Sequence, residues 1–320
     1  MLSRTAEAIY WMSRYIERAE NVARFIEVNC HLMLDLPVAP VNQWEALIYT
    51  TGDQGLFAKH FENPTRENVI DFLVYHPENP NSILSCLIRA RENARSIREI
   101  ISSEMWEQLN KFYWMVQNSN RRRALDAPYD YFSEIKNASH LFTGIAHTTM
   151  AREEAWSFGY LGSLLERADK TSRILDVKYF ILLPSITDVG TPFDNIQWSA
   201  LLKSTSGLEV YRKRYGRIHP ENVVAFLILD RAFPRSIHYC IMEAQHALSA
   251  ITGSPAHTYR NMVEQKLGRL VADLNYATIE EIFALGLHEY LDRVQIRFDD
   301  INAAIHDTFF KLIEAESAIV

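Results

Sequence analysis

The chain contains 320 residues with a formal net charge of −7, and 48% of the residues are hydrophobic while 23% are charged. This composition excludes a disordered chain and argues against a protein that coats nucleic acid, which needs an excess of positive charge. Eleven glycines and eleven prolines are each about 3.4% of the chain, below the usual ~7% and ~5%. So few turn-forming residues favour long helices over a many-turned β-sandwich or barrel.

Helical periodicity runs through most of the chain, because apolar residues recur at i, i+3 and i+4. It predicts an all-α fold, a helical bundle or array, with continuous helix expected across the middle of the chain near 149–156. Breaks are expected at 36–40, 77–80, 118–130 and 184–195, where prolines or polar residues gather. The expected helices span residues 3–35, 42–51, 65–76, 80–118, 130–156, 157–183, 195–204, 220–231, 235–252, 255–275 and 278–316.

The sequence carries no sign of secretion or of a membrane span. Cys30, Cys86 and Cys240 cannot build a disulfide framework and form no Cys-x-x-Cys pair. No apolar run approaches the ~18 residues that a membrane helix needs, and the first residues contain no apolar signal core. We therefore expect a cytoplasmic protein without a membrane partner. No cofactor or metal is predicted, since the chain has no P-loop, dinucleotide-binding, Gly-x-Ser-x-Gly or zinc-ligand motif.

An internal repeat divides the chain into two halves, roughly 1–150 and 151–320. Residues 43–90 align with 197–244 at an offset of 154, without a gap, and share 16 identities in 48 positions. Chance would give about 3 at ordinary residue frequencies. A second match, at an offset of 149, relates 15–28 to 164–177. Because no flexible linker separates the halves, we expect two tandem repeats packed as one body with pseudo-twofold symmetry.

Charged residues of both polarities border the apolar face of the repeated helix. On a wheel of 100° per residue they form a stripe about 80° wide. Both halves keep the same order of acid and base, which a merely solvated face does not require. The stripe holds Glu17, Glu20, Arg24 and Glu27 in the first half and Glu166, Asp169, Arg173 and Asp176 in the second, with Arg18 and Arg167 on the other flank of the core face.

Three interpretations of the stripe stay open. It is a solvated face, a structural ion network, or a shared cleft in which arginines bind a phosphate or carboxylate and carboxylates bind an ammonium group or metal. An exposed ion pair between residues four apart in a helix contributes only ~0.3–0.5 kcal/mol to stability. Removing one partner of a buried ion pair instead costs ~3–5 kcal/mol. We expect the two stripes to meet in a sheltered hollow. The candidate ligand-binding residues are Arg18, Glu20, Arg24, Arg167, Asp169 and Arg173.

Glu17 and Glu166 are the candidate catalytic residues. A carboxylate that is crowded by another and shielded from water has its pKa raised toward neutrality, which suits a general acid or base. If the stripes form a shared cleft, the same two carboxylates are also candidate metal ligands.

Several motifs closely resemble those of the alpha-E domain family, a family of bacterial all-helical proteins with a Glu-Arg motif and no known function. The resemblance covers essentially the whole chain, and its Glu-Arg segments are specific. One departure is Ser163, which stands where the first half has Arg14, so the second half lacks one base. The motifs are Leu2-Ser3-Arg4-x-Ala6-Glu7-x-x-Tyr10-Trp11-Met12-x-Arg14-Tyr15-x-Glu17-Arg18-Ala19-Glu20-Asn21, Asn79-Pro80-x-Ser82-Ile83, Arg91-Glu92-Asn93-Ala94, Ser102-x-Glu104-x-Trp106 and Leu161-Gly162-x-x-Leu165-Glu166-Arg167-Ala168-Asp169.

The resemblance implies a role in ATP-dependent amide or peptide-bond formation. Members of the family are typically encoded beside, or fused to, circularly permuted ATP-grasp proteins, often with transglutaminase-like proteins nearby. It therefore implies an accessory component with an ATP-grasp partner, in which the Glu-Arg clusters bind an anionic ligand or partner. The alternatives are a stand-alone enzyme that uses Glu17 or Glu166, and a scaffold in which the Glu-Arg ion networks only hold helices together.

Overall fold

The protein consists of helices joined by loops in the part of the chain that the structure describes. No strand occurs there, so the predicted all-α fold is confirmed. Within the same part of the chain, no helix combines the length and the apolar character that crossing a bilayer requires. The structure is a computed structural model, and it describes residues 1–35, 43–180, 192–255 and 258–311.

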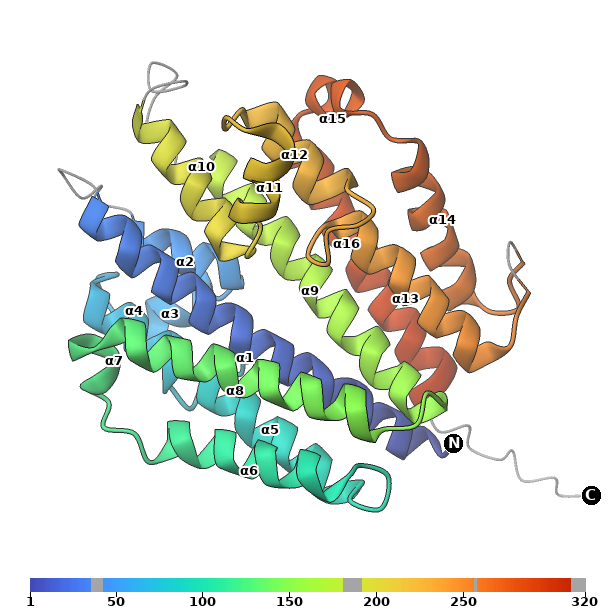
Figure 1. The fold of residues 1–320 in the computed structure, drawn as a ribbon. Coiled ribbons are helices and arrows are strands. Elements are labelled where there is room, and N and C mark those ends of the chain that lie inside the picture. The colour runs from blue at the N-terminus through green and yellow to red at the C-terminus, as the bar shows by residue number, and fades with distance from the viewer. Residues whose placement is uncertain (36–42, 181–191, 256–257, 312–320) are drawn as a thin grey trace, which may run out of the picture.

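Two long helices, α1 (Ser3–Asp35) and α9 (Glu154–Phe180), pack against each other through the centre of the molecule (Figure 1). Helices α5 (Ile83–Ser96) and α8 (Pro128–Thr149) pack on α1, while α13 (Ile237–Thr252) and others pack on α9. The remaining helices are α2 (Gln43–Thr51), α3 (Gln54–His60), α4 (Arg66–Val74), α6 (Ser103–Gln117), α7 (Arg123–Asp126), α10 (Pro192–Ser204), α11 (Leu208–Tyr215), α12 (Pro220–Leu229), α14 (Met262–Tyr276), α15 (Ile279–Leu285) and α16 (Leu287–Ile305), followed by a π-helical turn at His306–Phe310.

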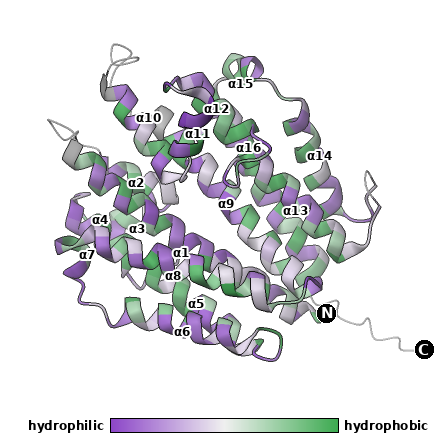
Figure 2. Cartoon of the chain, viewed as in Figure 1, coloured by the Kyte–Doolittle hydropathy of each residue, from purple (hydrophilic) through white to green (hydrophobic). Residues whose placement is uncertain are grey.

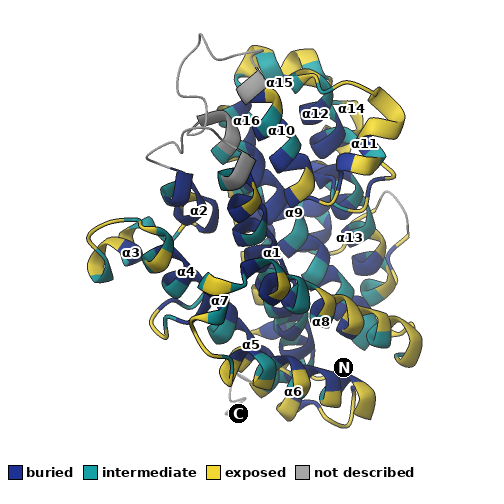
Figure 3. Ribbon diagram, turned by 60° about the vertical axis from the view of Figure 1, so that its left-hand side comes forward, coloured by how far each residue is buried: buried dark blue, intermediate teal, exposed yellow. Residues whose placement is uncertain are grey.

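The interior is continuous across both halves of the sequence. Side chains of α1, α5, α9 and α13 belong to one buried hydrophobic cluster. Figure 2 shows hydrophobic residues alternating with hydrophilic ones along the helices, and Figure 3 shows the central pair as buried over most of its length. The apolar face expected from the helical wheel is confirmed, since Ile16 and Ala19 of α1 and Leu165 and Ala168 of α9 are all buried. A polar residue on these two helices therefore needs a partner, because burying it alone is costly.

Two long expected helices are each divided in the structure. The helix expected at 80–118 is interrupted at 97–102, where the Ser102 hydroxyl accepts a hydrogen bond from the Met105 backbone amide and starts a new helix. The helix expected at 278–316 is interrupted at Gly286, whose φ of +99° is a conformation that favours glycine. The parts of the expected elements at 36–42, 181–191, 256–257 and 312–316 lie outside the described residues.

The continuous helix expected near 149–156 is also wrong. Helix α8 ends at Thr149, Met150 is extended, and α9 begins at Glu154. This break lets the chain reverse, so that Glu154 lies beside the start of α1 and pairs with the terminal amino group of Met1 at 2.8 Å. The short helices α3, α7 and α11 fall where no helix was expected, because segments of four to eight residues give too little periodicity to recognise.

Two glycines of α9 allow a close approach to α1. A Cβ at position 162 would lie 2.5 Å from the carbonyl oxygen of Tyr10, and one at position 159 would lie 2.9 Å from the Ser13 hydroxyl. Real Cβ atoms do not make such contacts, so the backbones meet at a separation that glycine permits. The approach brings the Glu-Arg segments of the two helices within reach of each other.

We predict that Gly162→Ala destabilises the fold by roughly 1–3 kcal/mol, since the added methyl group must push α9 away from α1. The matched control is Gly144→Ala in α8, where a Cβ meets nothing within 4 Å. That change should be neutral or stabilising by about 0.4–1 kcal/mol, because alanine restricts the unfolded chain. Urea denaturation measures both free energies of unfolding, and equal midpoints for the two variants would contradict the close approach.

Candidate functional site

The carboxylate of each Glu-Arg motif binds the guanidinium group of the other motif. Arg18 donates from Nε to Glu166 Oε1 at 2.6 Å and from Nη2 to Oε2 at 2.9 Å. Arg167 donates from Nε to Glu17 Oε1 at 2.9 Å and from Nη2 to Oε2 at 2.8 Å. Both are bidentate pairs, the strongest geometry for these groups. Glu17 is 6% exposed and Glu166 is 0% exposed, so the two stripes meet in a sheltered place at these two residues, as expected, while the rest of each stripe has its partners elsewhere.

Glu166 is held by further cations. Arg14 lies on the same carboxylate, with Nε 2.9 Å and Nη2 2.8 Å from Oε2, and Lys170 Nζ lies 3.7 Å from Oε1. The Arg14 guanidinium also donates from Nη1 to Asn302 Oδ1 at 2.7 Å and to the Tyr10 hydroxyl at 3.1 Å. Each charged group in this part of the interface thus has an oppositely charged partner, as burial of charge requires.

Glu17 has a different second cation, Arg235. Its Nη1 lies 3.4 Å from Glu17 Oε1, and its Nη2 donates to both oxygens of Glu20 at 2.9 and 2.7 Å. Sequence reasoning missed this residue, although the repeat held a signal. At an offset of 154, Arg235 aligns with Asn81, whose Oδ1 accepts a hydrogen bond from Arg18 Nη1 at 2.7 Å. The two halves share the Pro-x-Ser-Ile motif, but its second residue is an asparagine in the first half and an arginine in the second. This change marks a difference between the surroundings of Glu166 and Glu17.

The remaining candidate ligand-binding residues extend the same network along α1 and α9. Arg24 pairs with Glu20, and Arg173 donates from Nε to both oxygens of Asp169 at 2.9 and 3.0 Å. All six candidates therefore form ion pairs within the protein, and their assignment to ligand binding stays a prediction. Among the described residues, no three His, Cys, Asp or Glu side chains are grouped so that they could hold a metal ion.

The network keeps Glu166 ionised. Burial alone would raise the pKa of this carboxyl, but Arg18, Arg14 and Lys170 outweigh burial and hold the pKa well below its usual range. Arg235 and Arg24 likewise lower the pKa of Glu20 against the effect of burial. The expectation of a pKa raised toward neutrality is therefore wrong for Glu166, because the neighbouring cations were not counted. A carboxylate with such a low pKa has no proton to donate near neutral pH.

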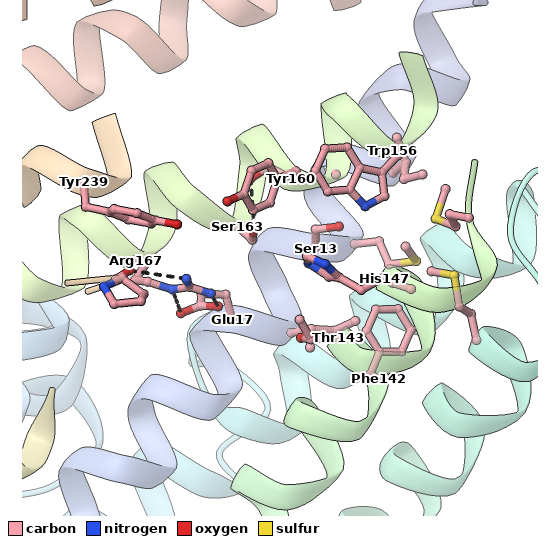
Figure 4. A pocket seen from close by; sticks show the side chains of 18 residues that line it. Ser13, Glu17, Phe142, Thr143, His147, Trp156, Tyr160, Ser163, Arg167 and Tyr239 are labelled. Carbon is pink, nitrogen blue, oxygen red and sulfur yellow. Dashed lines mark hydrogen bonds and ion pairs between the residues drawn. The ribbon is translucent and has the colours of Figure 1, made fainter. Parts of the chain in front are cut away.

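A pocket of about 180 Å³ opens beside the Glu17–Arg167 pair, between α1, α8 and α9 (Figure 4). Its wall includes Trp156 and Tyr160, whose rings stack with centroids 4.6 Å apart. The His147 ring makes edge-to-face contacts with both rings. Burial, together with Arg152 and Arg167, lowers the pKa of His147. The pocket thus joins an aromatic wall to one buried ion pair, an arrangement suited to a small ligand with a charged end.

The fold and the network define an all-helical protein whose centre is a buried Glu-Arg cluster. The chain belongs to the Alpha-E family, since the model of that family, described as a predicted alpha-helical domain with a conserved ER motif, matches residues 1–310. The resemblance drawn from the motifs is confirmed. Relatives in Mycobacterium bovis and in two strains of Mycobacterium tuberculosis are uncharacterized proteins, each 20% identical over 340 residues that cover 99% of this chain and 37% of the relative. The chain thus spans just over a third of the length of these relatives. No solved structure matches it.

Glu166→Gln should lower the free energy of unfolding by about 3–5 kcal/mol, because it leaves Arg14 and Arg18 buried without a counter-charge. The control is Glu92→Gln, which breaks the pair with Arg95 at 2.9 Å, where the Glu92 side chain is 50% exposed. An exposed pair contributes ~0–1 kcal/mol. Chemical denaturation distinguishes the two, and a loss below 1 kcal/mol for Glu166→Gln would show that the network does not stabilise the fold.

Acid should destabilise the protein through the same groups. The folded-state pKa values of Glu166 and Glu20 lie below the ordinary value of about 4.3, so the unfolded chain takes up protons first as the pH falls. Their stabilisation is fully present above that value and is lost progressively at lower pH. Unfolding free energies measured between pH 7 and pH 3 should fall less steeply for Glu166→Gln than for the natural chain, and parallel profiles would contradict this.

Proposed function

We propose that this protein is an accessory binding component of an ATP-grasp-dependent, cytoplasmic system that forms amide or peptide bonds. In this proposal the Glu-Arg network fixes α1 against α9, and the pocket at the Glu17–Arg167 pair receives the ligand. The observation that carries it is an aromatic-walled pocket that ends on a buried ion pair. Buried charges next to a small pocket are typical of a binding site that recognises one charged group.

The ATP-grasp partner follows from the family resemblance, as does a transglutaminase-like protein as a second partner. Two features of the relatives and of the chain support an accessory role. The matched segment is 37% of each mycobacterial relative, which leaves room in those chains for further domains. The 320 residues contain no phosphate-binding motif, so a system that consumes ATP would need another domain or protein to bind it.

The charge of the ligand is a separate question from the role of the protein. The sequence predicts an anion on the arginines, but Arg18 and Arg167 already donate in bidentate fashion to carboxylates of the protein. An anion would have to compete with Glu166 or Glu17 for these donors. The geometry favours a ligand that enters the pocket and leaves both pairs intact.

We further propose that the two halves, 1–150 and 151–320, are repeats related by a pseudo-twofold axis near the Glu-Arg network. The reciprocal pairs support this, since each glutamate binds the arginine of the other half. Local structure supports it too. Ser82 and Ser236 each cap a helix by accepting from the backbone amide three residues on, and Cys86 and Cys240 each approach the carbonyl of the preceding proline, Pro80 or Pro234.

A scaffold without a ligand is the second candidate, and the observation that favours it is the completeness of the ion pairing. A stand-alone acid–base enzyme has less support, because Glu166 is ionised and bound on both oxygens. A scaffold would tolerate a blocked pocket as long as the network stayed intact, and a binding component would not.

The test is co-expression with the neighbouring ATP-grasp protein, followed by mass analysis of the products that the pair forms with ATP. We predict a complex whose product requires both proteins. Thr143→Phe should reduce product formation about tenfold or more without lowering the melting temperature, because Thr143 is exposed at the pocket and outside the network.

The matched control is Thr148→Phe, an exposed residue of the same helix that does not line the pocket. Failure of the two proteins to associate would contradict the proposal. Full activity of Thr143→Phe would favour the scaffold, and product formed by the purified chain alone would favour the enzyme.

A further inference from the structure

The pocket lies where the repeat has lost an arginine. At the offset of 149, Ser163 aligns with Arg14, and Ser163 lines the pocket. The first half has an arginine side chain at this position, which crosses from α1 to the carboxylate of Glu166 on α9. The serine is too short to cross to Glu17 in the same way, so the corresponding volume is open.

The surroundings of Arg14 have counterparts around the pocket. The Arg14 guanidinium covers the Trp11 ring at 4.9 Å, and Tyr160 of the pocket aligns with Trp11 at the same offset of 149. Arg14 also donates to the side-chain oxygen of Asn302. When His147 is aligned with His306, at an offset of 159, Asn302 corresponds to Thr143, which lines the pocket. An aromatic face, a side-chain oxygen and a carboxylate are thus present in both places.

The carboxylate at the pocket has unused capacity. Three guanidinium nitrogens lie within 2.9 Å of Glu166 Oε2, two of them from Arg14. Within the described residues, Glu17 Oε2 accepts one hydrogen bond, from Arg167 Nη2 at 2.8 Å. Arg235 approaches the other oxygen, Oε1, at 3.4 Å. A carboxylate oxygen has two lone-pair sites, so Glu17 Oε2 can accept from a second cation.

We propose that this pocket binds an alkylguanidinium group of a ligand in the position that the Arg14 side chain fills in the first half. The ligand is therefore arginine itself or a molecule that carries an arginine side chain. Its guanidinium donates to Glu17 Oε2 and covers the Tyr160 ring, as Arg14 does with Glu166 and Trp11. The ligand and Arg167 then donate to the same carboxylate oxygen, as Arg14 and Arg18 already do at Glu166 Oε2, while Arg235 stays beside Glu17 Oε1.

The size of the pocket fits this assignment. Its volume of about 180 Å³ is below the ~300–1,000 Å³ of pockets for drug-sized ligands, so it suits a group of side-chain size rather than a nucleotide. Aromatic rings there also attract guanidinium, since the Arg152 guanidinium lies 4.2 Å from the Trp156 ring centroid. The proposal rests on the proposed function in that it names the chemical class of ligand for the same pocket.

The probe is n-propylguanidinium, which reproduces the arginine side chain beyond Cα, and the matched control ligand is n-propylurea, its neutral isostere. We expect propylguanidinium to raise the melting temperature of the full chain and to shift the indole NMR signal of Trp156, while propylurea does neither at equal concentration. This comparison uses the natural chain and so does not depend on any variant folding. Equal effects of the two compounds, or no effect of either, would overturn the proposal.

The decisive variant is Ser163→Arg, which should supply the missing side chain. We expect it to fold, to melt no lower than the natural chain, and to bind propylguanidinium at least about tenfold more weakly. Thr148→Arg, which adds an arginine on α8 outside the pocket, is the control and should bind as the natural chain does. Undiminished binding by Ser163→Arg would place the probe elsewhere and would also overturn the proposal.

Further ligands separate this inference from the proposed function. Phosphate and glutamate test the anionic alternative, and stabilisation by them that Ser163→Arg alters would contradict an alkylguanidinium site. Free arginine and a short arginine-containing peptide then distinguish the two sources of the group. Binding of propylguanidinium without any ATP-grasp complex would contradict the proposed function alone, and a productive complex without cation binding would contradict this inference alone.

Discussion

The burial of two glutamates in the contact between α1 and α9 is the constraint on which the rest of the structure depends. A charged carboxylate cannot lie among apolar helices unless cations accompany it. Arg18 and Arg167 meet this need across the interface, and Arg14 and Arg235 add a second cation to each side. The short separation that these contacts require is in turn permitted by Gly162. The ion pairs and the close packing of the two backbones therefore depend on each other.

Much of the fold follows from local sequence, and much of the site does not. Apolar periodicity was sufficient for α1 and for the core faces of α1 and α9, because buried stripes repeat every turn. The wheel also placed Glu17 beside Glu20, but it could not reveal that the partner of Glu17 is Arg167, since that contact spans 150 residues of chain. Arg235 was missed for the same reason. The breaks at Ser102 and Gly286 depend on one hydroxyl cap and one backbone angle, signals too small to emerge from periodicity.

The two glutamates differ in how completely their charge is compensated, and this difference bears on function. Glu166 is fully enclosed, and three cations lower the pKa of its carboxyl. Glu17 faces a pocket and shares Arg235 with Glu20. If holding the helices together were the network's sole role, nothing would require the two ends to differ. The network thus has one end, at Glu166, that is enclosed, and one end, at Glu17, that faces a pocket.

Glu17 belongs to both roles, and this determines which substitutions are informative. Its carboxylate pairs with Arg167 and Arg235 and also lines the pocket, so replacing it weakens the interface and alters the pocket together. A loss of function at Glu17 therefore has two physical causes that the activity alone does not separate. Ser163 and Thr143 line the pocket without making an ion pair, and changes there alter the shape of the pocket while the buried pairs stay in place. Because the pocket adjoins the ion pairs that hold α1 against α9, substitutions at these two positions test ligand binding without disturbing those pairs.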